Sequence, residues 1–352
     1  MAVDGYAIFT ICSNNYVPMA KVLLESARRH HPDAALYLCL ADEALIDQRF
    51  YPEGCTVVRA DALEIPDFRD FAFRYDVMEF NTALKPFMFR HLLARGHRGV
   101  IYLDPDVEIH SPLESVIDLI EDGASFVLTP HLTEPAERED YPDDIGIMRA
   151  GIFNLGFLGV GASEEADRIL RWWSRKLRFH CINEQESGIF VDQKFMDLVP
   201  GFADHARVLR DKTCNVAFWN IYQRELTRSS DGWYVDGRPL CFFHFSGINV
   251  NDKSRLSKHT DAFSDLDECN ALGALVSAYI DRLIANGHGS IPPGIYSYGR
   301  FASGTPICKQ VRQMYRDSHT QWALGDPFET YEEYLHLTCV PRAGSSRFSV
   351  TH

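Results

Sequence analysis

The chain is predicted to have an α/β fold, with a mostly parallel central sheet flanked by helices, and three observations support this. Short apolar segments alternate with helical patterns over the first hundred residues, which is the arrangement of parallel strands joined by helices. These segments are rich in aliphatic and β-branched residues, as buried strands are. With 352 residues, 46% of them hydrophobic, the chain is long enough for one large or two modest domains.

Each element of the first half has its own signal. Residues 6–11 (YAIFTI) are predicted to form the first buried strand. Residues 18–30 follow as a helix with Ala20, Leu23, Leu24 and Ala27 on one face. Further strands are expected over residues 35–40, 56–60, 100–103 and 125–129, and helical structure over residues 76–95 before and after Pro86.

The second half is more varied. Residues 134–144 (EPAEREDYPDD) are acidic and contain prolines, which predicts a mobile loop. Then come a glycine-containing strand over residues 151–161, an amphipathic helix over 164–178, a strand over 240–245 and a long helix over 266–286. Because the pattern changes near residue 260, we expect a catalytic domain over residues 1–260 and a mainly helical C-terminal extension over residues 261–352.

Charge and composition exclude several classes of protein. The net charge of −14 argues against a nucleic-acid partner, because such proteins carry basic patches. Nine cysteines without CxxC pairs indicate reduced thiols and a cytoplasmic protein. Neither a signal peptide nor a transmembrane segment is expected, while peripheral contact with the inner face of a membrane stays open.

Asp104-Pro105-Asp106 is the most informative motif. Residues 100–103 form an apolar strand, and two carboxylates follow at its end with a proline between them. Open α/β sheets bind ligands at the carboxyl ends of their strands. Oxygen ligands suit hard octahedral ions such as Mg²⁺ and Mn²⁺. The alternative is a solvated turn.

His244 is a candidate third metal ligand, because it ends an apolar strand where a histidine must be satisfied or useful. A hydrogen-bonded core histidine is the alternative. Ser246-Gly247 follows, and small residues let backbone N–H groups approach a phosphate.

Three further positions allow both a functional and a structural interpretation. Asp192-Gln193 lies among aromatic residues and either binds sugar hydroxyls or begins a helix, with Asp192 as its N-cap. Asn154 either bridges strands or points at a ligand. Lys85 either neutralises a phosphate or is a solvated surface lysine.

Taken together, these residues resemble a GT-A glycosyltransferase, most closely family 8 and its relatives, which retain the anomeric configuration, and related bacterial polysaccharide glycosyltransferases. The shared motifs occur in order as Thr10 to Tyr16, Lys85, Asp104-Pro105-Asp106, Phe153-Asn154-Leu155-Gly156, Asp192-Gln193 and His244-Phe245-Ser246-Gly247. They cover about 240 residues, and no single one of them is as specific as the ordered set.

The resemblance implies a role for each position. Asp104, Asp106 and His244 would hold Mn²⁺ or Mg²⁺ against the diphosphate of a nucleotide-sugar, with Pro105 between the two carboxylates. The remaining positions would bind the donor: Thr10, Ile11, Ser13, Asn15 and Tyr16 the nucleoside, Lys85 and Gly247 the phosphates, and Asn154 and Asp192 the sugar hydroxyls. Gln193 would lie on the sugar face opposite the leaving group and, with Asp192, form the catalytic pair.

The chain departs from the family pattern in places. The family has a diphosphate-binding lysine where this chain has Val250. Lys253 and Lys258 are the nearest lysines, and we expect Lys258 to replace it. Lys194 follows Gln193 where an acidic residue is common. Residues 301–316 resemble a segment found after this domain in some bacterial polysaccharide glycosyltransferases.

The implied activity is a metal-dependent, retaining transfer of a hexose from a nucleotide-sugar, with UDP-hexose as the family default. The expected acceptor is a hydroxyl of a surface glycan or lipid-linked saccharide. Two alternatives stay open at this point: a metal-dependent sugar nucleotidyltransferase or pyrophosphatase, and a non-catalytic sugar-binding relative.

Overall fold

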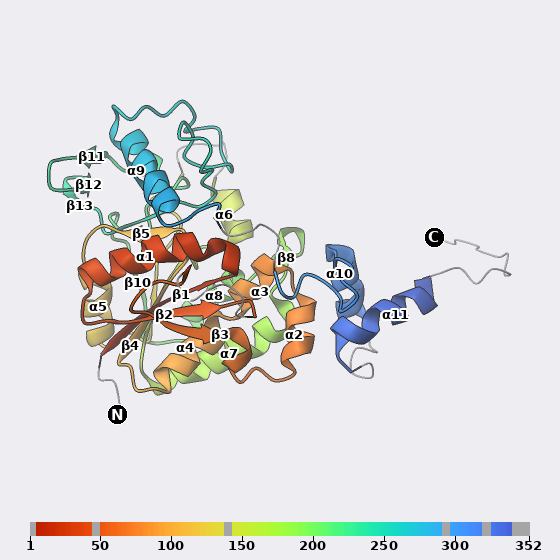
Figure 1. Cartoon of the computed structure of the whole chain (residues 1–352). Coiled ribbons are helices and arrows are strands. Elements are labelled where there is room, and N and C mark those ends of the chain that lie inside the picture. Colours follow the sequence, from red (N-terminus) through yellow and green to blue (C-terminus); the bar gives the residue numbers. More distant parts are fainter. Residues whose placement is uncertain (1–4, 44–49, 137–142, 291–295, 319–324, 340–352) are drawn as a thin grey trace.

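The computed structural model describes residues 5–43, 50–136, 143–290, 296–318 and 325–339, and its centre is a seven-stranded sheet (Figure 1). In spatial order the strands are β10 (Ala206–Val208), β6 (Phe126–Leu128), β7 (Phe157–Gly161), β4 (Gly99–Leu103), β1 (Tyr6–Cys12), β2 (Ala35–Leu40) and β3 (Thr56–Arg59). Among these strands only β7 runs antiparallel to its neighbours, β4 and β6. The predicted mostly parallel α/β architecture is confirmed.

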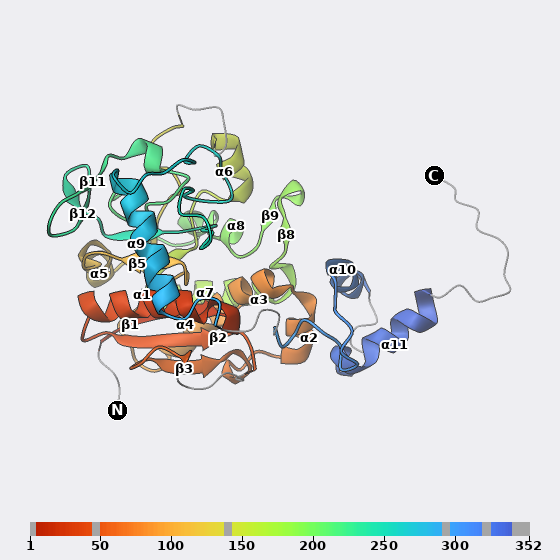
Figure 2. The ribbon, with the colours of Figure 1, turned by 45° about the horizontal axis from the view of Figure 1, so that its top comes forward.

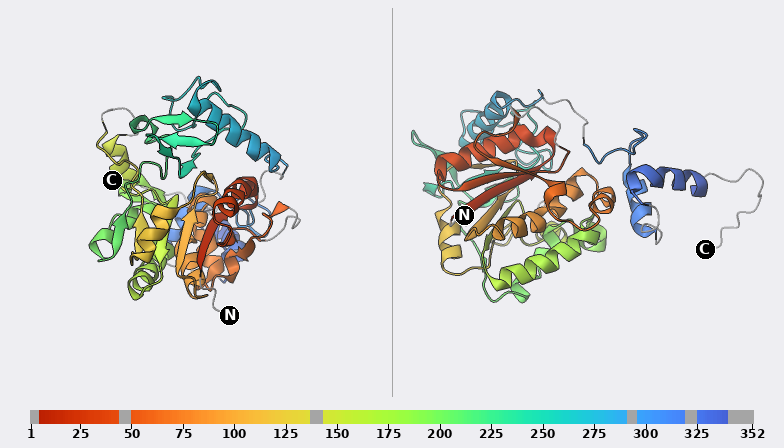
Figure 3. Two further views of the ribbon diagram at one scale, coloured as in Figure 1. Left: turned by 90° about the vertical axis from the view of Figure 1, so that its left-hand side faces the viewer. Right: turned by 60° about the horizontal axis from the view of Figure 1, so that its bottom comes forward.

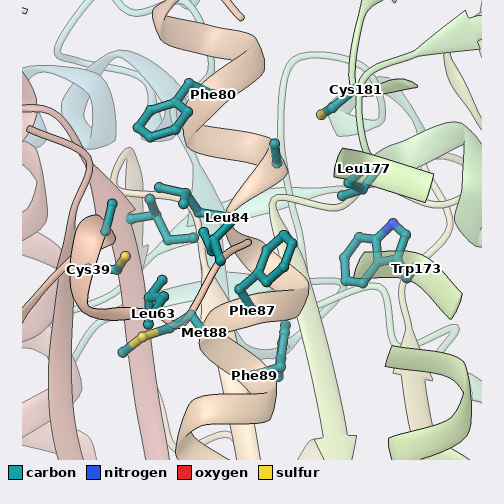
Figure 4. Packing of buried hydrophobic residues seen from close by; sticks show 14 of the residues in the cluster. Cys39, Leu63, Phe80, Leu84, Phe87, Met88, Phe89, Trp173, Leu177 and Cys181 are labelled. Carbon is teal, nitrogen blue, oxygen red and sulfur yellow. The ribbon is translucent and has the colours of Figure 1, made fainter. Parts of the chain in front are cut away.

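Helices cover both faces of this sheet (Figures 1 and 3). On one face pack α1 (Val17–His30) and α5 (Glu114–Glu121). On the other pack α3 (Val77–Ala83), α4 (Lys85–Leu93) and α7 (Glu164–His180). Figure 4 shows this second layer, with Phe87 of α4 turned toward Trp173 of α7. Because both faces are covered, β1 and β4 are apolar along their length rather than alternating.

The remaining elements extend the chain beyond this core. They are α2 (Phe68–Arg74), α6 (Asp144–Ala150), α8 (Gln193–Met196), α9 (Ala271–Ala285), α10 (Lys309–Asp317) and α11 (Pro327–Cys339), with the short strands β5 (Val107–Ile109), β8 (Asn183–Glu184), β9 (Ile189–Phe190), β11 (Leu226–Arg228), β12 (Trp233–Val235), β13 (Arg238–Pro239) and β14 (Phe242–His244). Within the described residues, no helix combines the length and the hydrophobicity that crossing a membrane requires.

A two-stranded ribbon outside the main sheet matters most for the site. β5 pairs antiparallel with β14, which sets His244 opposite Val107, and the Phe245 N–H donates to the Asp106 carbonyl at 2.8 Å. Two segments far apart in sequence therefore meet beside Asp106. α9 lies across α1 and β5 (Figure 2): its Arg282 donates to Glu108 at 2.5 Å.

The C-terminal helices pack against α2. α10 and α11 contact α2 at one side of the sheet (Figure 3). Arg312 of α10 is 2% exposed, and its guanidinium donates to the carbonyls of Ala72, Phe73 and Tyr298. The domain boundary near residue 260 stays a prediction.

Several predicted elements differ from those observed. The strand predicted over 151–161 is wrong in its first half, because Gly151, with φ of 124°, ends α6, and β7 begins only at Phe157. The helix predicted from residue 266 begins at Ala271, where the Asn270 side chain caps it. Of the predicted loop 134–144, residues 137–142 lie outside the described residues, and Asp144 already belongs to α6.

Candidate active site

A cleft of about 610 Å³ opens where β1 and β4 end. The predicted residues that line it are Tyr16, Lys85, Asp104, Asp106, Asn154, Asp192, Gln193, His244, Gly247 and Lys258. This is the edge at which open α/β sheets bind ligands. A cavity of equal volume lies between α4 and α7, but among the described residues the metal-ligating cluster belongs to the first cleft.

Part of the predicted nucleoside loop lies behind the cleft wall. Thr10, Ile11 and Ser13 are buried, and Asn15 is exposed. None of the four lines the cleft, and neither does Pro105. The Ser13 hydroxyl accepts a hydrogen bond from the Asn81 side chain at 3.1 Å. Of this loop, only Tyr16 faces the cleft directly.

Asp104, Asp106 and His244 form a cluster that could hold a metal ion, because their ligand atoms lie within 4.8 Å of one another. His244 Nε2 is 3.0 Å from Asp106 Oδ1 and 3.8 Å from Asp104 Oδ2. Two carboxylates and one imidazole are a donor set that suits Mn²⁺ or Mg²⁺. The structure thus brings the three predicted ligands together, and their role in holding a metal ion stays a prediction.

The charges in this cluster stabilise one another. Burial would lower the pKa of His244, but the carboxylates of Asp106 and Asp104 outweigh it and raise that pKa. Burial would raise the pKa of Asp106, but His244 outweighs it and lowers that pKa. A metal ion bound here would displace the imidazole proton, because histidine ligates as the neutral ring.

Lys85 is buried, and so the interpretation of a solvated surface lysine is wrong. Its ammonium group donates to the Leu155 carbonyl at 2.7 Å and pairs with Asp192 Oδ2 at 2.8 Å. It also lies 3.8 Å from Asp104 Oδ1. Burial would lower the pKa of Lys85, but Asp192 and Asp104 outweigh it and raise that pKa. Lys85 thus links a metal-ligating carboxylate to a second carboxylate in the cleft.

Asp192 stands at the N-cap position of α8, but its side chain makes no capping hydrogen bond. The predicted helix is therefore present and begins after Asp192, but the Asp192 side chain does not cap it. Its carboxylate is 2% exposed and faces Lys85, while its carbonyl accepts from Trp173 Nε1 at 3.3 Å. The ion pair holds a negative charge inside the cleft, where an unpaired one would cost several kcal/mol.

Gln193 and Asn154 are partly committed to the protein itself. Gln193 Oε1 accepts from the Leu155 N–H at 3.0 Å and its Nε2 donates to the Ala150 carbonyl at 2.8 Å. Asn154 Oδ1 accepts from the Gly156 N–H, and its Nδ2 donates to His131 Nε2 at 3.2 Å. Each amide group has two hydrogens, so each side chain keeps one to offer a ligand.

Two positions in the site require glycine, because a histidine side chain lies close to the backbone at each. A Cβ atom on Gly156 would lie 2.3 Å from His244 Cε1, and one on Gly247 would lie 2.5 Å from His259 Cδ2. Gly247 also has φ of 76°, a conformation that side chains disfavour. These glycines let the backbone come close to the cluster.

The loop after Gly247 folds back over the cleft. The Lys258 N–H donates to the Gly247 carbonyl at 2.9 Å, and no residue of the described part of the chain pairs with the Lys258 ammonium group. Lys253 instead pairs with Asp281 at 2.7 Å and donates to Ser277, while Val250 packs against the core. Of the two lysines, Lys258 is the one at the cleft.

The sequence reasoning missed residues that support the site. Tyr102 donates to Asp104 Oδ1, and His131 and Trp219 line the cleft. Burial and then Asp104 raise the pKa of Tyr102 well above its usual value, so the hydroxyl keeps its proton. Residues two apart on a strand share a face, and this rule could have identified Tyr102. The other two lie in loops without a regular pattern.

No family model matches the chain, and two relatives in sequence are described as uncharacterized proteins. It is 25% identical to the uncharacterized protein YfnD of Bacillus subtilis (strain 168) over 246 residues, which cover 68% of this chain and 77% of YfnD. It is 22% identical to YfnF of the same organism over 263 residues, which cover 72% of this chain and 86% of YfnF.

Several solved structures similar to this chain are described as glycosyltransferases. The galactosyltransferase LgtC, in complex with donor and acceptor sugar analogues, is 14% identical, covers 82% of this chain and 98% of its own, and has a TM-score of 0.48. The glycosyltransferase GlyE of Streptococcus pneumoniae TIGR4 is 16% identical, and the match covers 85% of this chain and 67% of the GlyE chain, with a TM-score of 0.45. Mouse xyloside xylosyltransferase 1 is 15% identical, and the match covers 68% of this chain and 97% of the mouse chain, with a TM-score of 0.42. All three TM-scores are below 0.5.

Proposed function

We propose that the chain is a metal-dependent, retaining GT-A glycosyltransferase that moves a hexose from a nucleotide-sugar, UDP-hexose by preference, to a hydroxyl of a glycan or lipid-linked saccharide. The observation that carries this is the convergence of Asp104, Asp106 and His244 in one cleft with Asp192 and Gln193. A metal cluster alone fits many enzymes. Its combination with sugar-type hydrogen-bonding groups favours a sugar diphosphate.

Asp104, Asp106 and His244 would hold Mn²⁺ or Mg²⁺, with Pro105 keeping the two aspartates apart on a rigid turn. A divalent ion there stabilises the negative charge that develops on a departing diphosphate, without supplying a proton. Gly247 offers its backbone at the rim, and Lys258 supplies the free positive charge that Val250 does not. Since Lys85 is tied to Asp192 and Asp104, its part is to fix those carboxylates rather than to reach the phosphates.

The nucleoside would lie along the loop after β1, against Tyr16. In this proposal Thr10, Ile11 and Ser13 form the rigid wall behind it, and Asn15 lies at its exposed edge. The sugar would lie deeper in the cleft, where Asn154 donates its free amide hydrogen and Asp192 accepts from a hydroxyl.

The side chains favour retention by front-face attack. An amide is a poor nucleophile, and Gln193 is further held by the Leu155 N–H and the Ala150 carbonyl. Asp192 is paired with Lys85, so it too is poorly suited to attack. We infer that the acceptor oxygen bonds to the anomeric carbon on the face that the diphosphate leaves. The acceptor proton passes to the departing phosphate oxygen, and the broken bond's electron pair stays on that oxygen.

We infer the acceptor and the cellular location of the enzyme from the composition of the chain and from its family resemblance. A cytoplasmic enzyme working at the inner face of a membrane, on a saccharide that the membrane carries, fits the acidic chain and its reduced cysteines. The C-terminal extension beyond residue 260 would serve this acceptor side or the stability of the domain.

The test is a thermal-shift screen against UDP-, GDP- and dTDP-sugars, with and without Mn²⁺. We expect one UDP-hexose to raise the melting temperature only when Mn²⁺ is present. Asp106→Asn should abolish this shift, and Lys253→Met is the matched control, because that lysine lies outside the cleft. No shift with any nucleotide would overturn the proposal.

Product analysis then separates the remaining classes. With an α-linked donor, NMR of the product should show an α-linkage, and a β-linkage would overturn the front-face mechanism. Release of pyrophosphate, or of a sugar phosphate without acceptor, would instead identify a nucleotidyltransferase or pyrophosphatase. Metal-dependent binding without turnover on any acceptor would identify a sugar-binding relative.

A further inference from the structure

The two oxygens of the Asp104 carboxylate have different surroundings. Oδ1 accepts a hydrogen bond from the Tyr102 hydroxyl and lies 3.8 Å from the Lys85 ammonium group. Oδ2 faces His244 Nε2 at 3.8 Å. One oxygen is therefore held by the protein, while the other points into the cluster with His244 and Asp106.

The Tyr102 hydroxyl has no evident task in packing. The side chain is 2% exposed, and its ring packs against Phe9 at 5.0 Å between centroids and lies 4.6 Å from the Lys85 ammonium. A phenylalanine would make the same ring contacts. A buried hydroxyl is costly unless it is hydrogen-bonded, and the bond that the described residues give this one is to Asp104.

We propose that Tyr102 is a positioning residue that holds Asp104 as a one-oxygen ligand. The inference rests on the proposed metal site and deepens it, because it concerns which ion the site prefers. Holding Oδ1 by a hydrogen bond keeps the carboxylate from rotating to chelate an ion with both oxygens.

This restraint has a consequence for metal choice. Small ions such as Mn²⁺ and Mg²⁺ take octahedral sets in which a carboxylate gives one oxygen, whereas Ca²⁺ accepts both oxygens of a carboxylate and a larger number of ligands. With the hydroxyl removed, Asp104 can turn and offer both oxygens. The site should then lose affinity for Mn²⁺ more than for Ca²⁺.

The experiment compares Tyr102→Phe with a matched variant, Tyr37→Phe. Tyr37 lies on β2, which β1 separates from β4 in the same sheet. It is 8% exposed, and its hydroxyl pairs with His97 Nε2 at 3.1 Å, outside the cleft. Mn²⁺ binding is measured without nucleotide by the electron paramagnetic resonance signal of the free ion, and Ca²⁺ binding by competition with Mn²⁺. Thermal unfolding without metal checks that both variants fold.

We expect Tyr102→Phe to weaken Mn²⁺ binding by about 10- to 100-fold, the usual effect of removing a hydrogen bond to a metal ligand. The ratio of the Ca²⁺ to the Mn²⁺ dissociation constant should fall as well, which a loss of packing alone would not produce. Tyr37→Phe should leave both constants within about twofold, since its hydroxyl touches no ligand. In an Asp104→Asn background, Tyr102→Phe should have no further effect, which tests the coupling directly.

Three results would overturn the inference. If a folded Tyr102→Phe variant binds Mn²⁺ with unchanged affinity, Tyr102 does not position Asp104, while the proposed function is unaffected. An equal loss in both tyrosine variants, or an unchanged Ca²⁺ to Mn²⁺ ratio, shows a general packing effect. If the wild-type protein binds no divalent ion, with or without nucleotide, the proposed metal site fails and the inference fails with it. If Tyr102→Phe does not fold, the Asp104→Asn variant still tests the ion preference, because the wild-type ratio should be lost there.

Discussion

His131 makes the stability of the protein depend on pH, and the direction follows from its burial. The ring lies in the cleft wall, where Nε2 accepts from Asn154 Nδ2 at 3.2 Å and Nδ1 lies 3.4 Å from the Ile152 carbonyl. Because an amide nitrogen only donates, the ring proton is on Nδ1. Burial lowers the pKa of His131 from 6.5 to about 4, so the folded protein holds the ring neutral.

A pKa that folding lowers gives stability that is present above the unfolded pKa and lost as the pH falls. The loss should begin near pH 6.5, the unfolded value, and continue to about pH 4. From these two pKa values the free energy of unfolding should fall by about 2 kcal/mol between pH 7.5 and pH 5.0 through this residue alone.

The assay is urea unfolding of wild type and His131→Gln at both pH values, followed by circular dichroism. The variant should be less stable than wild type by about 1–2 kcal/mol at pH 7.5, because a buried hydrogen bond is lost. That deficit should shrink or vanish at pH 5.0, since glutamine does not titrate. His205→Gln, at an exposed position, is the control and should leave the curves parallel. If the free energy of unfolding of His131→Gln changes with pH as much as that of wild type, burial does not hold the His131 ring neutral.

Three other predictions concern the site and the C-terminal helices. Asp106→Ala and His244→Ala should each abolish metal-dependent nucleotide binding in calorimetry, and a site that survives either change is not the one described. Arg312→Met should lower the free energy of unfolding by about 3 kcal/mol or more, since three buried carbonyls lose their donor, whereas the exposed Arg300→Met should change it by less than about 0.5 kcal/mol in urea titrations. Gly247→Ala should weaken nucleotide binding at least tenfold while the melting temperature without ligand falls by only a few degrees; unaltered affinity would remove this glycine from the site.

Local patterns predicted the fold well, because parallel strands covered on both faces have a strong signal. The bounds of β2 were predicted without error, and β1 and β4 to within a residue. The prediction failed over residues 151–156, where an apolar, glycine-containing segment was taken for a strand. Gly151 ends a helix there and Gly156 makes room for His244. Neither property depends on the segment's own sequence pattern.

The candidate site was predictable where one segment carries two groups, as in Asp104-Pro105-Asp106. Site residues were harder to predict where burial decides the role of a side chain. Lys85 was left open as a surface lysine because its partner Asp192 is distant in sequence, and only the fold brings the two within 2.8 Å. Tyr102 was missed because its ring also suits a buried strand, although its position two residues before Asp104 places both side chains on one face.

The charges in the cleft explain why metal and nucleotide should bind together. Three carboxylates, those of Asp104, Asp106 and Asp192, line the cleft, and the buried ammonium group of Lys85 lies beside two of them, Asp104 and Asp192. These three negative charges exceed the one positive charge of Lys85 by two, which a single divalent cation would balance. The carboxylates of Asp106 and Asp104 also raise the pKa of His244. A diphosphate entering without the cation would meet these carboxylates with only Lys258 to attract it. Nucleotide alone should therefore bind weakly, and its affinity should rise with metal by the same factor by which nucleotide raises the affinity for metal.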